Sequence, residues 1–378
     1  MTYLIGFLTL VFLGLTIAVV MRMQSVLKST KTEIVEDNAP VPNNNANAIM
    51  CLLFLVFGSI GGVWSYFHYE STFQLPIASP HGRITDHMFW VSMGILSVAL
   101  VVVNVLIFFF SWKYSYNKNR KAKFYPENHV LELVWTVIPA VVMAYLVFTG
   151  YVAWTNIMAE APSNAQVVEI MGKQFNWWVR YGGNEDNKLG KYNYKLVDDT
   201  NNNPMGIDFS DANAFDDFIH NGEMHLIVNR PVALKIRARD VLHSVFIPHM
   251  RVKMDAVPGM PTKFQFTPDR TTKEMRAELE NPKFDYEIAC TEVCGRGHFS
   301  MRLRLIVEDE ASFNKWKASQ KPVLATILEN KPDFMSKIPQ DLKAKAMKYM
   351  PVPAEPVVPV ANTKPAQTGS ALGASASL

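Results

Sequence analysis

The fold of this chain is decided by one short stretch, Cys290-Thr-Glu-Val-Cys294-Gly-Arg-Gly-His298-Phe-Ser-Met301. Two thiols, an imidazole and a thioether occur within its twelve residues, spaced four, four and three positions apart. A second imidazole, His243, lies upstream in Asp240-Val-Leu-His243-Ser. Soft sulfur combined with imidazole selects copper or zinc over hard cations, and the thioether favours copper. The stretch therefore predicts a copper site.

The number of cysteines indicates two copper ions. A single blue-copper centre needs one cysteine, two histidines and a weak methionine, and this stretch has one cysteine more. Two thiolates four residues apart can bridge two coppers, each also holding one histidine, with Met301 and a backbone carbonyl as weak outer ligands. Such a pair shares one electron and has no open position for substrate, so it is an electron relay.

Other interpretations of the cysteine pair are a disulfide or half of a zinc site. The added histidine and methionine favour copper over both. The remaining histidines lack comparable neighbours in the sequence, and we interpret them as structural or surface residues: His68, His81, His87, His129, His220, His225 and His249.

The copper stretch belongs to a segment with β character, from Gln166 to about Val307. Short alternating runs rich in Val, Ile, Phe and Arg are separated there by Pro, Gly, Asn and Asp. This pattern predicts a cupredoxin-like antiparallel β-sandwich or barrel, with His243 between strands. The expected strands are 167–171, 225–228, 233–238, 263–266 and 301–307.

Two further segments surround this β region. An insert over 181–223 is rich in Asn, Gly and acids, and can be a solvated loop or an acidic face for a cationic partner. Residues 310–320 are typical of a short amphipathic helix, and 321–350 of partly helical chain. From Pro351 onward the composition predicts a disordered tail.

The first 155 or so residues have a different character. Of the 378 residues, 49% are hydrophobic and only 19% are charged, against about 25% in a soluble chain. Four apolar runs, near 3–20, 48–67, 89–111 and 132–155, are long enough or nearly so to cross a membrane as helices. A purely soluble protein and a wholly embedded transporter are both excluded. The first run could be a signal peptide, but it lacks a basic start and a cleavage pattern, so we expect it to be retained.

Basic residues in the short loops predict the orientation. They follow the first and third runs, whereas the loop over 68–88 has only Arg83. Both basic loops are therefore expected in the cytoplasm, and everything after residue 155 outside. The basic residues are Arg22, Lys28, Lys31, Lys113, Lys118, Arg120, Lys121 and Lys123.

Charge and cysteine content exclude several classes of protein. The net charge is +3, and no dense basic stripe lies outside the loops, so nucleic acid is not an expected partner. Three cysteines exclude a disulfide scaffold, and the absence of C-x-x-C-H excludes covalently attached haem c.

The copper stretch resembles the dicopper loop of subunit II of haem–copper cytochrome c oxidases. The similarity covers roughly 75–320, and extends to Lys253-Met-Asp255-Ala-Val-Pro-Gly259, Glu132-Leu-Val-Trp135-Thr-Val-Ile-Pro139 and Ser79-Pro-His-Gly82. Together with the apolar runs and the composition of the C-terminal part, it divides the chain into a transmembrane helical region over 1–155, a dicopper domain over 156–320 and an extension over 321–378. It also implies a bacterial-type inner membrane with the large domain on the outer side.

The resemblance implies a role for each matching residue. Cys290 and Cys294 would bridge two coppers, His243 and His298 would be terminal ligands, and Met301 with the Glu292 carbonyl would complete the shells. The Glu292 carboxylate would reach a magnesium ion shared with subunit I. Glu132 would lie at the mouth of a proton-uptake path.

The match weakens where electrons would enter. The family has Gly-His-Gln-Trp-Tyr-Trp, and this chain has Gly172-Lys-Gln-Phe175-Asn-Trp177-Trp178. Phe175 stands where the first tryptophan is expected, and Trp177 keeps the second position. The donor would be a c-type cytochrome, either soluble or part of a neighbouring complex. The two helices near 3–20 and 48–67 are additional to the family's usual pair.

The resemblance thus implies a subunit at which electrons enter a respiratory oxidase, passing to the haem–copper site of subunit I, where oxygen is reduced and protons are moved. Membrane lipid and further oxidase subunits would be partners. A quinol-oxidising relative lacks the copper ligands that are present here. A nitrous-oxide reductase would need a second copper domain. A membrane-anchored copper chaperone or thiol oxidoreductase would not need Met301 or the Glu132–Pro139 motif.

Overall fold

The computed structural model describes residues 11, 13–23, 44–115, 119–121, 123–183 and 187–351. Three helices in these ranges are long and apolar enough to cross a membrane: α2 (Asn44–Phe73), α3 (Pro80–Lys113) and α4 (His129–Met158). They confirm three of the four expected spans. The described part of the first run is a shorter apolar helix, Leu13–Met23, and the rest of that run lies outside the described residues.

The described residues fall into two compact units. One contains α2 and the part of α3 from Met93 onward. The other contains the first turns of α3, α4 from Val134 onward and all the strands. No side chain of α4 is buried, so its apolar surface is open to lipid or to other proteins.

Ten strands form two five-stranded sheets, with orders β3-β2-β1-β5-β8 and β4-β10-β9-β6-β7. The predicted sandwich is confirmed, and the sheets are mixed, because β1 pairs in parallel with β5 and β10 in parallel with β4. The strand bounds are β1 Gln166–Lys173, β2 Asn176–Tyr181, β3 Phe218–His220, β4 Glu223–Ile227, β5 Val232–Ala238, β6 His243–Ile247, β7 Val252–Ala256, β8 Thr262–Phe266, β9 Tyr286–Cys290 and β10 Arg302–Glu308.

The alternation seen in the sequence matches the observed burial. In β5 the side chains of Val232, Leu234 and Ile236 are buried, whereas Lys235 is exposed. A strand directs successive side chains to opposite faces, so one face supplies the core. The main core lies among these strands and includes Trp177, Tyr181 and Tyr286.

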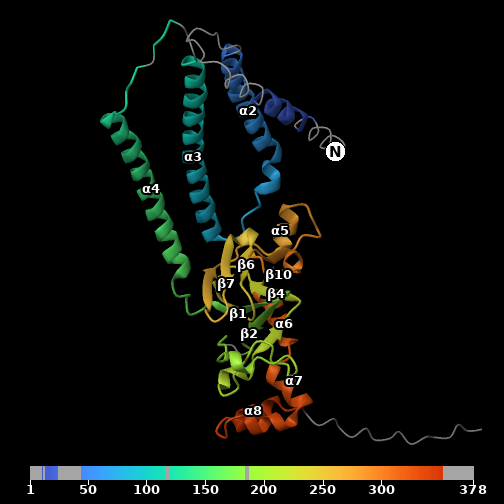
Figure 1. The fold of residues 1–378 in the computed structure, drawn as a ribbon. Coiled ribbons are helices and arrows are strands. Elements are labelled where there is room, and N and C mark those ends of the chain that lie inside the picture. The colour runs from blue at the N-terminus through green and yellow to red at the C-terminus, as the bar shows by residue number, and fades with distance from the viewer. Residues whose placement is uncertain are drawn as a thin grey trace, which may run out of the picture. The chain divides into compact units, whose positions relative to one another are not determined.

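A second, smaller core joins the insert to the C-terminal extension. Ile207 and Phe215 of the insert pack with Leu324 and Leu328 of α7 (Val323–Asn330), and Ala346 of α8 (Lys343–Ala346) completes the cluster. Figure 1 shows α7 and α8 beside the insert at one end of the β domain. The chain between the strands and after β10 also forms α5 (Thr272–Glu278) and α6 (Glu310–Ala318). The expected disordered tail lies outside the described residues.

Several acidic residues of the insert form ion pairs or hydrogen bonds with other residues of the chain. Asp217 is fully buried and paired with Arg180, and Asp199 is paired with Lys173 and Arg239. Asp211 accepts from the backbone N–H of Asn213. The insert is a folded element of the domain, and Glu185 and Asp186 lie outside the described residues.

Candidate metal centre

The loop between β9 and β10 carries most of the predicted ligands. Cys290 ends β9, and Met301 directly precedes β10. The backbone N–H of Cys290 donates to the carbonyl of Met301 (3.1 Å), which closes the loop. Gly295 has φ of +131°, a conformation that favours glycine, and allows the chain to turn toward His298.

Sheet pairing brings His243 to this loop. His243 is the first residue of β6, not a residue between strands as expected, and β6 pairs with β9 through Val245 and Cys290. A two-stranded pairing thus unites ligands that are 47 positions apart in the sequence. The difference from the prediction arises because β6 is buried on both faces and shows little alternation.

The donor atoms of the predicted ligands converge. The two cysteine Sγ atoms are 3.9 Å apart. Nδ1 of His243 lies 3.9 Å from Sγ of Cys290, and Nδ1 of His298 lies 3.7 Å from Sγ of Cys294. The Met301 Sδ is 3.8 Å from Cys294 Sγ, and the Glu292 carbonyl is 3.3 Å from Cys290 Sγ. Among the described residues, His243, Cys290 and Cys294 form the one cluster with metal-ligand geometry.

This donor set fits copper. Both cysteines are free thiols in this structure, and the two sulfur atoms are available to a metal. Burial, followed by the neighbouring Cys290, raises the pKa of Cys294 to about 11. Two thiolates at this distance repel each other, and bound cations would stabilise the deprotonated pair. Sulfur, imidazole and thioether donors are those that copper prefers.

Two residues that the sequence analysis did not assign hold the ligands in place. Oδ1 of Asp240 accepts from Nε2 of His243 (2.8 Å), which leaves Nδ1 directed toward Cys290. Oδ2 of Asp240 accepts from the backbone N–H of Gln174 (2.7 Å). The Gln174 side chain in turn donates to the carbonyl of Cys294 (2.6 Å). The signal in the sequence was the Asp three residues before His243, since a carboxylate commonly orients a ligating histidine.

The charge of Asp240 suits this role. Burial raises the pKa of its carboxyl group, but hydrogen bonds from the Gln174 backbone, His243 and Val241 outweigh burial and hold the pKa below its ordinary value. Asp240 is therefore an anion at neutral pH and can only accept hydrogen bonds.

The two aromatic residues expected at the site differ in exposure. The Phe175 ring is 39% exposed and lies against Gly295 and Gly297 of the ligand loop. A Cβ on Gly297 would lie 2.5 Å from Cγ of Phe175, so only glycine allows this approach. Trp177 is fully buried, with its ring 5.9 Å from that of His243. Phe175 thus lies at the surface and Trp177 behind it.

Glu292 and Glu132 lie in different parts of the chain. The Glu292 side chain is half-buried and belongs to the loop that carries most of the predicted ligands. Glu132 is in the first turn of α4, where Oε1 accepts from the Asn128 backbone and Oε2 is 3.3 Å from Nδ1 of His129. A carboxylate there also stabilises the helix start, which is the structural interpretation of this residue.

Comparison with known families identifies both halves of the chain. Residues 67–151 match the family described as cytochrome c oxidase subunit II, transmembrane domain, and residues 166–308 match its periplasmic domain. The second description agrees with the outer location predicted from the basic loops. The spans and the β domain therefore belong to an integral membrane protein with an outer domain.

Individual relatives agree with the family match. The alternative cytochrome c oxidase subunit 2 of Bradyrhizobium diazoefficiens is 32% identical over 277 residues, which cover 72% of this chain and 91% of the relative. Cytochrome c oxidase subunit 2 of Thermostichus vulcanus is 25% identical, covering 65% of this chain and 78% of the relative. A crystal structure of the periplasmic domain of subunit II of cytochrome oxidase from Bradyrhizobium japonicum is 21% identical and covers 43% of this chain and 96% of that one, with a TM-score of 0.28. By its sequence and its two matching domains, this chain belongs to the cytochrome c oxidase subunit II family.

Proposed function

We propose that this chain is the subunit at which electrons enter a respiratory terminal oxidase. The observation that carries the proposal is the convergence of two thiols, two imidazoles and a thioether at one place in the outer domain. Electrons would pass from a c-type cytochrome through this centre to the haem–copper site of subunit I, where oxygen is reduced to water and protons are translocated. Oxygen chemistry would belong to subunit I.

Six residues would hold two copper ions: His243, Cys290, Glu292 through its carbonyl, Cys294, His298 and Met301. When bound, two copper ions would supply one-electron transfer with little rearrangement, and Cys290 and Cys294 would hold both of them. The chain supplies a rigid and dry surrounding for this, because His243, Cys290, Cys294 and Met301 are all buried. Asp240 orients His243, and the Gln174 side chain fixes the backbone of the loop.

The copper proposal is tested on the purified full chain after loading with copper. We expect two coppers per chain and an electron-spin spectrum in which the unpaired electron is delocalised over both nuclei. Cys294→Ser should leave at most one localised copper, whereas Cys51→Ser, at the third cysteine, should change neither measurement. One localised copper in the native chain, or none with a Cys290–Cys294 disulfide, would contradict the proposal and favour the copper chaperone or thiol oxidoreductase.

Electrons would arrive at the Phe175 edge. This ring is exposed and contacts the ligand loop, and Trp177 lies behind it beside His243. The donor would be a soluble c-type cytochrome or a haem subunit of a neighbouring complex. We expect Phe175→Ala to slow reduction of the copper centre by a c-type cytochrome about tenfold, which corresponds to 1.4 kcal/mol. The exposed Tyr194 in the insert provides a control, and equal rates in Phe175→Ala and Tyr194→Ala would remove Phe175 from this role.

Glu292 is proposed to contribute its carboxylate to a magnesium ion at the boundary with subunit I. Two observations support this proposal: the Glu292 side chain is half-buried, and it belongs to the same loop as Cys290 and Cys294. In the assembled oxidase, Mn²⁺ can replace Mg²⁺ as a spin probe. We expect Glu292→Gln to lose this Mn²⁺ signal and Glu280→Gln, at an exposed position, to keep it.

Glu132 is proposed to take up protons at the cytoplasmic edge of a bacterial-type inner membrane. Its side chain is 45% exposed and paired with His129, so water can reach it. Glu132→Gln keeps a side chain that can accept at the helix start but removes the acid. We expect it to slow proton uptake during turnover in the assembled oxidase. Glu127→Gln is the control, and equal proton uptake in the two variants would leave Glu132 with its helix-capping role alone.

A further inference from the structure

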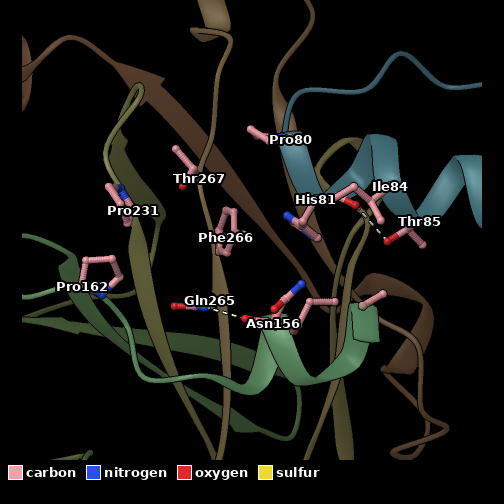
Figure 2. A pocket seen from close by; sticks show the side chains of 12 residues that line it. Pro80, His81, Ile84, Thr85, Asn156, Pro162, Pro231, Gln265, Phe266 and Thr267 are labelled. Atoms are coloured by element: carbon pink, nitrogen blue, oxygen red, sulfur yellow. Dashed lines mark hydrogen bonds between the residues drawn. The ribbon is translucent and has the colours of Figure 1, made fainter. Parts of the chain in front are cut away.

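A cavity of about 310 Å³ lies where the first turns of α3, the end of α4 and β8 meet. Its volume is at the lower end of the range for small-molecule sites. Most of its surface is apolar, and the lining residues that the argument uses are His81, Ile84, Asn156, Gln265 and Phe266 (Figure 2). No Asp, Glu, Lys or Arg lines this cavity. Among its lining residues, His81 alone has an ionisable side chain.

Two polar groups in this cavity lack hydrogen-bond partners. Both ring nitrogens of His81 are buried without one. The His81 ring lies edge-on to Phe266, with the ring centres 6.3 Å apart. Gln265 donates to the Asn156 carbonyl (2.6 Å), but its own Oε1 is buried and unpaired. A buried polar group without a partner is costly, so these atoms favour a ligand that can both donate and accept.

A second cavity of about 430 Å³ continues from the first. The two share Ile84, Ala153 and Asn156 in their walls. The α3 residues along the second cavity run from Ile84 to Ser92 on one helix face, and eight residues of helix rise about 12 Å. Because α3 and α4 are membrane-spanning helices, this groove extends from the outer membrane surface into the apolar layer.

The charges nearby are already neutralised. Arg83 on the same helical turn pairs with Asp269, and Asp86 accepts from two nitrogens of Arg251 (2.7 and 2.8 Å). Neither Arg83 nor Asp86 lines the cavities. A phosphate head group would therefore find no free cation there, whereas an uncharged head with hydroxyl or carbonyl groups would satisfy His81 and Gln265.

We propose that His81 and Gln265 bind the uncharged, hydrogen-bonding head of a membrane amphiphile, whose apolar tail lies in the groove between α3 and α4. Two sources share this chemistry, an isoprenoid quinone and a diacylglycerol. The proposal concerns binding alone, and no electron transfer to the ligand is part of it. The site goes beyond the copper relay, and the ligand would fill the space between the β domain and the outer ends of the two helices.

The test uses the assembled oxidase in phosphatidylcholine nanodiscs with photoreactive probes. The probes are a decyl-benzoquinone, a dioctanoylglycerol and, as the charged comparison, a phosphatidylglycerol of equal chain length. We expect one or both neutral probes to label peptides over 80–92, 145–157 or 262–268 at least fivefold more than the charged probe. Labelling by the quinone alone, by the diacylglycerol alone or by both identifies the source.

Variants separate a specific site from general lipid contact. His81→Phe and Gln265→Leu should each lower this labelling at least fivefold, and His68→Phe, on the exposed surface of α2, should not. Ile84 lies in the wall of the groove and is half-exposed, so Ile84→Trp should fill the groove. This variant tests the site if His81→Phe and Gln265→Leu fail to assemble. The proposal is overturned if no probe labels these peptides, if the charged probe labels them equally, or if Ile84→Trp leaves the labelling unchanged.

Discussion

Oδ1 of Asp240 lies 2.8 Å from Nε2 of His243, so the carboxylate determines which nitrogen of the imidazole faces the two cysteines. The ionised carboxylate can only accept, and Nε2 therefore carries the proton. Nδ1 is then the nitrogen with a lone pair, which could bind a metal, on the side of Cys290. The same carboxylate accepts from the Gln174 backbone, which ties the β1–β2 turn to the ligand.

Asp240→Asn should weaken copper binding. The amide can still accept from Gln174, but it no longer fixes the His243 ring as an anion does. Loss of such a partner typically lowers metal affinity about 10–100-fold. Copper competition titration of the full chain measures this, with Asp255→Asn at an exposed position as the control. Equal affinities for the two variants would show that His243 is oriented by packing alone.

Gly172→Ala should distort the site without removing a ligand. A Cβ at this position would lie 2.8 Å from Cδ2 of His243 and 3.0 Å from Cζ3 of Trp177. Because both neighbours are fully buried, neither can move away freely, and overpacking of this kind costs about 1–3 kcal/mol. We expect a lower melting temperature and an altered copper spectrum. Gly94→Ala, where an added Cβ meets nothing within 4 Å, should leave both unchanged.

Leu324→Ala should loosen the insert while sparing the copper centre. Leu324 is fully buried in the smaller core, which is separate from the core around the ligands. Truncation of a buried leucine costs about 2–5 kcal/mol. Hydrogen exchange should accelerate over 205–217 and 323–346, with an unchanged copper spectrum. Met347→Ala, at an exposed position, is the matched control, and faster exchange throughout the β-sandwich would indicate that the two cores unfold together.

The stability of the domain should depend on pH through Asp217. Burial raises the pKa of this carboxyl group to about 7, although Arg180 opposes the rise. Between its ordinary pKa near 4 and pH 7, the unfolded chain has lost a proton that the folded chain keeps. Stability therefore falls as pH rises through this window and levels off above it. A difference of about three pKa units corresponds to a loss of up to about 4 kcal/mol, since each unit is worth about 1.4 kcal/mol.

Asp217→Asn isolates this effect. The variant cannot ionise, so its melting temperature should fall less than that of the native chain between pH 5 and 8. Asp341→Asn, at an exposed position, should keep the native pH dependence. Parallel curves for native chain and Asp217→Asn would mean that Asp217 is ionised throughout, paired with Arg180.

The features that could be predicted from the sequence are those set by neighbours along the chain. The spacing of Cys290, Cys294, His298 and Met301 predicts their convergence because one short loop carries all four. Alternation predicted β5, where one face is buried. The alternation does not reveal strand β6, because the three successive residues His243, Ser244 and Val245 are all buried.

Features that depend on distant parts of the chain could not be predicted in this way. The parallel pairing of β4 with β10 joins Met224 to Leu305, and no local pattern marks it. The smaller core has the same origin, since the polar composition of the insert hides Ile207 and Phe215 until α7 covers them. The sequence gives no sign that Asp217 is buried beside Arg180, because both residues are typical of surfaces.

The separation of the copper ligands along the chain has a consequence for biogenesis. His243 comes from β6, and the other side-chain ligands come from the loop before β10, which is the last strand of the sandwich. During export, therefore, almost the whole domain must cross the membrane before the donor set exists. If these residues bind copper, the metal would be delivered to a folded or nearly folded protein on the outer side, and a chain interrupted before Cys290 would be exported with His243 as the only one of these side-chain donors.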